Sequence, residues 1–156
     1  MVHYIFVWEE NSRNMHKNHQ IREVSWEQAQ REIKAVREAV FIVEQRVTPE
    51  LEWDGCDPVC SHVLAQSSGG ETIGTARMLP DGQIGRMAVL QQWRGLGVGS
   101  ALLKALLEIA KQQGFKGVFL NSQVGAIGFY SRHGFEVING PFMDAGIPHV
   151  KMTLCL

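Results

Sequence analysis

In the stretch Gln92-Trp93-Arg94-Gly95-Leu96-Gly97-Val98-Gly99-Ser100-Ala101-Leu102-Leu103, three glycines stand at alternate positions directly before an apolar run. Residues 83–90, which precede it, have the character of a strand. The order is therefore strand, glycine-rich turn, helix. Backbone N–H groups at a helix start have no intrahelical partner, and the helix dipole makes that end positive. Because glycine lets a ligand approach the backbone closely, the stretch predicts a site for a phosphate or pyrophosphate.

Several interpretations compete for this stretch. A P-loop requires Gly-Lys-Ser/Thr at the helix start, and this chain has Gly99-Ser100-Ala101 instead. A dinucleotide fingerprint requires an acid about 20 residues on, but the next strand ends in Asn121. A nucleotide-dependent oxidoreductase is therefore a weaker alternative, as is a tight turn without a ligand. The pattern Arg/Gln-x-x-Gly-x-Gly/Ala is matched at every fixed position by Arg94 to Gly99.

Length and composition bound the class of protein. A chain of 156 residues with 45% hydrophobic content fits one domain over residues 1–156, with 1–19 as an extra strand and loop. A net charge of −1 predicts no bulk attraction to nucleic acid or an anionic membrane. The sparse cysteines, Cys56, Cys60 and Cys155, indicate reduced thiols and a cytoplasmic protein. No metal is expected, because Cys56, Cys60 and His62 lack a zinc-ligand spacing.

Hydrophobic periodicity predicts alternating strands and helices. After a strand at 20–24, Ser25 and Gln28 form a capping box for a helix that runs to about residue 43. Strands at 61–66, 72–79 and 83–90, joined by short turns, predict an antiparallel meander. The helix after the glycines ends before Gly114, and a right-handed crossover makes the strand at 116–120 parallel to the strand before the helix. A helix over 126–133 and strands from 135 and over 149–156 complete the chain.

The segment between residues 44 and 57 is predicted to be a loop rich in acids. It holds five acids, and within it only Arg46 opposes them; the acids are Glu44, Glu50, Glu52, Asp54 and Asp57. One interpretation is a solvated loop. The other is an acidic rim that attracts a cationic amine, with apolar walls from Phe41, Val43 and Trp53.

A second motif follows in Gln123-Val124-Gly125-Ala126-Ile127-Gly128-Phe129-Tyr130-Ser131-Arg132-His133-Gly134-Phe135. With the glycine-rich stretch, it resembles the two acetyl-CoA motifs of the GCN5-related N-acetyltransferases, in family order. Gln123 stands where that family more often has Asn. Residues 41–45, 85–89 and 146–149 further resemble the small bacterial ElaA-like branch.

The resemblance implies an α/β fold in which a mostly antiparallel sheet of six to seven strands contains a central, splayed parallel pair and has helices on both faces. It implies acetyl-CoA as the cofactor, with the pantetheine arm in the splay. The implied cofactor-binding residues are Met87, Ala88, Val89, Arg94, Gly95, Leu96, Gly97, Val98, Gly99, Ser100, Gln123, Ala126, Phe129, Tyr130 and Arg132.

Acyl transfer from a thioester to an amine requires alignment, a polarised carbonyl and a proton for the leaving thiolate. Tyr130 is the predicted general acid, because a phenol stays protonated at neutral pH. The amine must lose a proton, and the sequence leaves Glu44, Asp57, His62 and His149 open as the acceptor. The residues expected to bind substrate are Phe41, Glu44, Trp53, Asp57 and His149.

The sequence therefore predicts an acetyl-CoA-dependent N-acetyltransferase acting on a primary amine of a small molecule or peptide. The alternative is a non-catalytic acyl-CoA-binding or regulatory module. A homodimer is left open as the assembly.

Overall fold

A computed structural model describes residues 4–5 and 18–156. The strands and helices, in chain order, are β1 (Tyr4–Ile5), β2 (His19–Val24), α1 (Trp26–Arg37), η1 (Glu38–Glu44), α2 (Pro49–Glu52), η2 (Asp57–Val59), β3 (Ser61–Ser67), β4 (Thr72–Met78), β5 (Gln83–Val89), η3 (Gln91–Trp93), α3 (Val98–Gln112), β6 (Gly117–Gln123), η4 (Val124–Ala126), α4 (Ile127–Arg132), β7 (Glu136–Asp144) and β8 (Ile147–Cys155).

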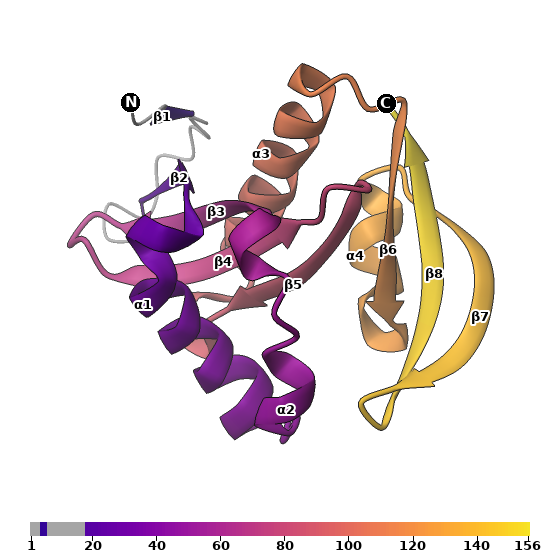
Figure 1. Ribbon diagram of the computed structural model, residues 1–156, viewed down its shortest axis with the longest axis horizontal. Coiled ribbons are helices and arrows are strands. Elements are labelled where there is room, and N and C mark those ends of the chain that lie inside the picture. The colour runs from indigo at the N-terminus through magenta and orange to yellow at the C-terminus, as the bar shows by residue number, and fades with distance from the viewer. Residues whose placement is uncertain (1–3, 6–17) are drawn as a thin grey trace.

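The described strands form one sheet in the order β1-β2-β3-β4-β5-β6-β8-β7 (Figure 1). Neighbouring strands are antiparallel except β5 and β6, which are parallel. The predicted mixed sheet is therefore confirmed, with seven strands from β2 to β8. The short β1 is part of the extra strand expected within residues 1–19, of which residues 1–3 and 6–17 lie outside the described part. The single-domain organisation stays a prediction.

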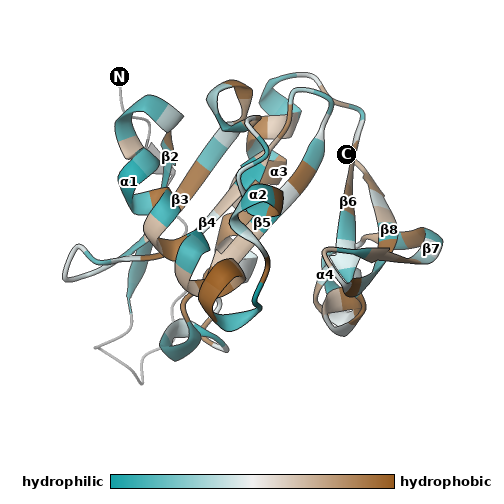
Figure 2. Ribbon diagram, turned by 60° about the horizontal axis from the view of Figure 1, so that its bottom comes forward, coloured by the Kyte–Doolittle hydropathy of each residue, from teal (hydrophilic) through white to brown (hydrophobic). Residues whose placement is uncertain are grey.

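Helices cover both faces of the sheet. Successive side chains of a strand point to opposite faces, so neighbouring residues of one strand pack against different helices. On β3, Val63 and Ala65 pack in the large core against α3, whereas Leu64 packs with Ala29 and Ile33 of α1. Figure 2 shows brown, apolar stretches along β3 and β4, the strands that these helices cover. This two-sided packing fixes the position of β5, which carries much of the site.

The first helix confirms its predicted start and changes character at its end. Ser25 caps α1, and its hydroxyl accepts from the Gln28 backbone N–H at 3.2 Å. From Glu38 to Glu44 the chain continues as a π-helix, with Gln45 N–H donating to the Val40 carbonyl at 3.1 Å. This wider turn, a feature often found at functional sites, directs Phe41 and Gln45 to the site described below.

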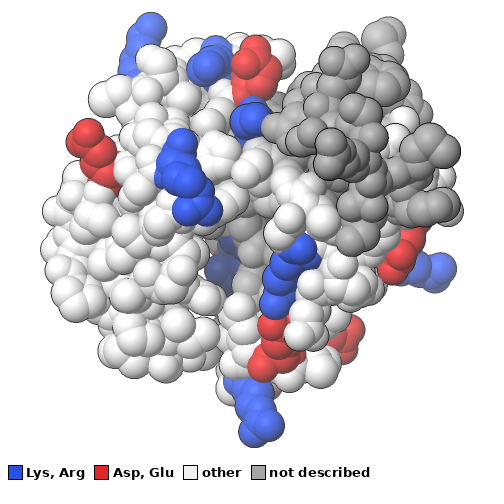
Figure 3. Space-filling view, turned by 180° about the vertical axis from the view of Figure 1, so that it is seen from behind, with Lys and Arg blue, Asp and Glu red and all other residues white. Residues whose placement is uncertain are grey.

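Two surface properties follow from the composition. On the face shown in Figure 3, described Lys, Arg, Asp and Glu side chains are dispersed among uncharged ones, in keeping with a net charge of −1. None of the helices in the described part of the chain has both the length and the apolar character needed to cross a membrane.

Candidate active site

The site begins where β5 and β6 separate. The two strands pair only at Gln83 with Phe119 and at Ile84 with Leu120, and they diverge beyond those positions (Figure 1). The predicted splay is thus confirmed. From Gly85 onward, one edge of β5 faces the opening instead of β6, so its backbone groups are available to another extended chain.

A β-bulge shapes this part of β5. Thr75 of β4 pairs with Ala88, but Arg77 pairs with Gly85, so β5 contains one extra residue. Arg86 in the bulge has a left-handed φ of 49°. A bulge re-aims neighbouring side chains, and both Arg86 and Met87 line the pocket described below.

The glycine-rich stretch starts α3 as predicted. Gly95 and Gly97 have φ values of 72° and 84°, conformations that favour glycine. The Ala101 N–H donates to the Gly97 carbonyl at 3.0 Å, so the preceding N–H groups of the first turn have no intrahelical acceptor. Ser100 Oγ lies 3.0 Å from Nε2 of His133, which ties this turn to the end of α4.

Arg94, a predicted cofactor residue, contacts two other groups in this structure. Its Nε donates to the Val89 carbonyl at 2.9 Å. Its two terminal nitrogens form a bidentate pair with Glu44 at 2.6 and 2.7 Å. Hydrogen bonding from Arg94 lowers the pKa of the Glu44 carboxyl. Glu44 is thus placed beside the glycine-rich stretch.

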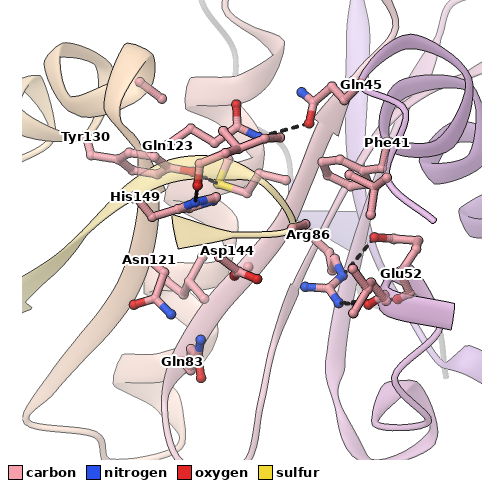
Figure 4. A pocket seen from close by; sticks show the side chains of 18 residues that line it. Phe41, Gln45, Glu52, Gln83, Arg86, Asn121, Gln123, Tyr130, Asp144 and His149 are labelled. Atoms are coloured by element: carbon pink, nitrogen blue, oxygen red, sulfur yellow. Dashed lines mark hydrogen bonds and ion pairs between the residues drawn. The ribbon is translucent and has the colours of Figure 1, made fainter. Parts of the chain in front are cut away.

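A pocket of about 260 Å³ lies at the splay (Figure 4). Its walls come from η1 and α2, from the first half of β5, from β6 and α4, and from the β7–β8 hairpin. Six predicted site residues line it: Phe41, Met87, Gln123, Ala126, Tyr130 and His149. The two halves of the chain meet directly here, since Gln123 Nε2 donates to Gln45 Oε1 at 2.9 Å.

Tyr130 reaches the splay from α4. Its ring contacts Phe129 and Phe135 edge-on, and its hydroxyl lies 3.4 Å from Met87 Sδ on β5. Burial raises the pKa of Tyr130 to about 12. The phenol therefore retains its proton at neutral pH, as a proton donor to a thiolate must.

His149 lies on the opposite strand, β8, with its ring stacked near Phe142 and its side chain in the pocket (Figure 4). Nδ1 is 2.7 Å from the Ile147 carbonyl oxygen, which can only accept a hydrogen bond. The hydrogen of the neutral ring is therefore on Nδ1, and Nε2 carries the lone pair. Of the candidate proton acceptors, this is the group that lines the pocket.

The acidic segment differs from its prediction. Arg46 is not the only opposing charge, because four of its acids pair with arginines from other elements. Arg37 contacts Glu52 at 2.5 Å and Asp57 at 2.6 Å, and Arg77 contacts Asp57 at 2.8 Å and also Asp54. We call Arg37, Arg77, Arg86, Glu52, Asp54 and Asp57 the ion-pair cluster. Its three positive and three negative charges balance, so the expected acidic rim is neutralised here.

Three further predicted residues lie in or near this cluster instead of lining the pocket. Asp57 is 3% exposed; burial raises the pKa of its carboxyl, but hydrogen bonds from Arg37 and Arg77 outweigh this and lower it. His62 is fully buried, and its Nε2 lies 2.8 Å from the Asp57 carbonyl oxygen. The Trp53 ring stacks on the Arg37 guanidinium at 4.8 Å.

Sequence reasoning missed several pocket residues: Gln45, Glu52, Gln83, Arg86, Asn121 and Asp144. Local signals existed for Gln45 and Arg86, which stand inside the stretches 41–45 and 85–89 that carried the family resemblance, and Glu52 was counted among the acids of the expected rim. Asn121 was taken as the end of its strand, whereas β6 continues to Gln123. The others depend on which segments meet across the splay.

The site thus combines a splayed parallel pair, a pocket at its opening and a glycine-rich helix start after the C-terminal end of β5, features that suit an extended, phosphate-bearing ligand. Comparison with known proteins specifies the class. The family model described as "Acetyltransferase (GNAT) domain" matches residues 40–156. The chain therefore belongs to the GNAT family of acetyltransferases, a class that depends on acyl-CoA.

Individual relatives agree with this assignment. The uncharacterised N-acetyltransferase YjcF of Bacillus subtilis is 39% identical over 75% of this chain and 86% of its own length. The crystal structure of Escherichia coli ElaA is 30% identical, with a TM-score of 0.73 over 87% of this chain and 97% of that one. An acyl-CoA N-acyltransferase from Pseudomonas aeruginosa is 26% identical, with a TM-score of 0.74 and coverage of 87% and 97%. The predicted family and its ElaA-like branch are confirmed.

The residues present fit an acyl-CoA. The open edge of β5 offers backbone groups to an extended amide chain, and the first turn of α3 offers N–H groups to a pyrophosphate. Residues Gly95 to Ser100 would surround the phosphates, and Ala126, Phe129 and Tyr130 would flank the arm. Arg132 is exposed at the end of α4.

Proposed function

We propose that this protein transfers the acetyl group of acetyl-CoA to a primary amine of a small molecule or peptide by direct attack of the amine on the thioester. The observation that carries the proposal is that Tyr130 and His149 line the same pocket at the β5–β6 splay. One is suited to give a proton and the other to take one.

Bound acetyl-CoA would supply the thioester carbon that the amine attacks and the thiolate that leaves. The amine arrives mainly as an ammonium, and Nε2 of His149 accepts its proton. Tyr130, whose pKa is raised to about 12 by burial, donates its proton as the sulfur departs and is reprotonated by the attacking nitrogen, which loses its second proton as the amide forms. General acid–base assistance of this kind contributes about 10²–10⁴ in rate.

The geometry favours His149 over the other candidate bases. Glu44 is held by both terminal nitrogens of Arg94, and Asp57 is enclosed by Arg37 and Arg77. His62 has no exposed surface. A proton acceptor must come within hydrogen-bond reach of the amine, directly or through one water molecule, and His149 meets this requirement from the pocket wall.

Ligand-dependent thermal stability tests the cofactor assignment. Acetyl-CoA at 100 times its Kd stabilises the protein by about 2.7 kcal/mol, which corresponds to roughly 5–10 °C in Tm. Gly97→Asp places a side chain and a negative charge at the start of α3 and should abolish the shift. Gly70→Asp is the matched control, since Gly70 and Gly97 share a φ of 84° and Gly70 lies in the β3–β4 turn.

The two glycine variants should lose comparable intrinsic stability through backbone strain, and only the variant in the glycine-rich stretch should lose the ligand response. Equal shifts for Gly97→Asp and wild type would show that acetyl-CoA binds elsewhere. A larger shift with octanoyl-CoA than with acetyl-CoA would contradict the choice of acyl group.

A further inference from the structure

Arg86 occupies a costly backbone conformation at the pocket wall. Its φ of 49° lies in the left-handed region, which a residue with a side chain adopts only when its surroundings impose it. The bulge that contains it directs the side chain toward α2, where that side chain is 27% exposed. In Figure 4, Arg86 meets Glu52 at one side of the pocket, and Asp144 and His149 approach from the other elements.

Only part of the Arg86 guanidinium is bound within the chain. Nε lies 3.1 Å from Glu52 Oε2, and Nη2 donates to the Leu51 and Glu52 carbonyls at 3.1 and 3.3 Å and to Asp54 at 3.3 Å. Among the described residues, no acceptor contacts Nη1. A guanidinium binds carboxylates through planar, directed N–H groups, so Nη1 retains two donors for a ligand.

The carboxylates near Arg86 do not compete for those donors. Glu52 Oε1 accepts from Arg37 at 2.5 Å, and Asp54 is bound by Arg77. The pocket contains one further carboxylate, Asp144, which belongs to the β7–β8 hairpin at another wall. The pocket therefore has a cationic donor on its β5–α2 wall, and a carboxylate and an imidazole on its hairpin wall.

We propose that the acceptor is a small amine that also carries a carboxylate, as an amino acid does. Its carboxylate accepts hydrogen bonds from Nη1 of Arg86, and its amine lies toward Asp144 and His149. This inference rests on the proposed acetyl transfer and specifies its acceptor. It also replaces the expected attraction of a purely cationic amine, because the ion-pair cluster leaves no net negative charge on the acidic segment.

Binding of reaction products tests the carboxylate site without requiring turnover. The probes are N-acetylglycine, N-acetyl-β-alanine and N-acetyl-γ-aminobutyrate, each compared with its carboxamide. The nitrogen is already acetylated in every probe, so each pair differs only in the charge of the other end. Isothermal titration of CoA-saturated protein should show about 10- to 100-fold tighter binding of the best-fitting carboxylate than of its amide, as expected for a charge-assisted hydrogen bond.

Arg86→Met keeps an unbranched apolar stem and removes the guanidinium, so the carboxylate and amide should then bind within about threefold of each other. Arg86→Lys keeps the charge and should retain part of the preference. Arg46→Met is the matched control, because it removes an exposed arginine from the nearby segment and leaves the pocket lining unchanged. A melt of each variant verifies folding.

Two failures are distinguishable. Equal binding of carboxylate and amide by wild type at all three lengths, or an undiminished preference in Arg86→Met, overturns the carboxylate site even if amines are acetylated. Conversely, a clear carboxylate preference in binding with no amine-dependent release of CoA would leave the site in place and contradict the acetyl transfer. If Arg86→Met does not fold, the carboxylate site is still tested by the binding of the carboxylate and carboxamide probes to wild type and to Arg86→Lys.

Discussion

The middle of β5 and its C-terminal end contribute to the site in different ways. At its C-terminal end, the chain enters a contiguous glycine-rich turn that offers backbone N–H groups at the start of α3. In the middle of the strand, the bulge at Arg86 joins the ion-pair cluster, whose side chains come from α1, the acidic segment, β4 and β5 and are at most 30% exposed. Substitutions in the glycine-rich turn and the pocket should therefore lower ligand affinity or reaction rate. Substitutions in the ion-pair cluster should lower the stability of the fold.

Of these substitutions, Tyr130→Phe should have the largest effect, and this effect should be confined to the reaction rate. Loss of the general acid should lower kcat by about 10²–10⁴, or roughly 3–5 kcal/mol of barrier. The Phe ring preserves the contacts with Phe129 and Phe135, so acetyl-CoA affinity and Tm should change little. Steady-state rates and melts of both proteins measure this. A near wild-type kcat, with a stability loss of about 1 kcal/mol from the lost hydrogen bond, would make the hydroxyl structural.

Arg37→Met should show the opposite pattern. It leaves Glu52 and Asp57 without their shared, 1% exposed partner, and breaking a buried pair costs about 3–5 kcal/mol. Urea unfolding measures the loss, with Arg46→Met as a surface control expected within about 0.5 kcal/mol of wild type. The folded fraction should still bind acetyl-CoA with wild-type affinity. A variant as stable as wild type that binds acetyl-CoA poorly would reverse the assignment of the two regions.

His62 should make stability near the ion-pair cluster depend on pH. Burial lowers the pKa of His62, because the charged imidazolium would lose its hydration, and Nδ1 has no hydrogen-bond partner among the described residues. An unfolded imidazole takes up a proton near pH 6.5, whereas the folded one stays neutral to lower pH. The contribution of this residue is therefore complete above about pH 6.5 and is lost as the pH falls through the lowered pKa, by at most about 1.4 kcal/mol per pH unit.

Comparison of wild type with His62→Gln isolates this effect, because the loss below about pH 6.5 should be smaller in the variant. His133, whose pKa is also lowered by burial, is present in both proteins and cancels in the difference. Asp54 and Asp57 titrate in a more acidic range. Parallel stability curves for the two proteins between pH 7 and pH 5 would contradict the inference that His62 is neutral when folded.

Glu44→Gln should have the smallest effect. Its pair with Arg94 is exposed, so its loss should change stability by less than about 1 kcal/mol. Because Glu44 holds the guanidinium that would otherwise contact the pyrophosphate, acetyl-CoA binding should tighten slightly, by up to about fivefold. Titration of acetyl-CoA measures it. A large fall in kcat with unchanged affinity would instead identify Glu44 as the base.

The glycine-rich turn, which offers backbone N–H groups to a ligand, was predictable from the sequence. The turn needs glycines at particular φ values and a helix that starts directly after them, so its signal lies in consecutive residues. The Ser25 cap and the parallel pairing of β5 with β6 were predictable for the same reason, because local spacing and crossover handedness determine them. The splay between these two strands was implied only by the family resemblance.

The ion-pair cluster was not predictable, because its partners are distant in the chain. Arg37 is 15 residues from Glu52, Arg77 is 23 from Asp54, and Arg86 is 32 from Asp54. Composition counts these charges without pairing them, so the acidic segment suggested a free rim. The π-helix over 38–44 and the bulge at Arg86 also escaped, since each inserts a residue for reasons of packing that periodicity does not record.

The central claim is that acetyl transfer occurs at the β5–β6 splay. The most direct measurement is steady-state release of free CoA thiol at saturating acetyl-CoA, with and without the amines glycine, β-alanine and γ-aminobutyrate, and with the product identified by mass spectrometry. We expect CoA release that depends on the amine, equals the amount of N-acetylated product and falls in Tyr130→Phe. Saturable acetyl-CoA binding with no amine-dependent release would contradict the account and indicate a non-catalytic acyl-CoA-binding module.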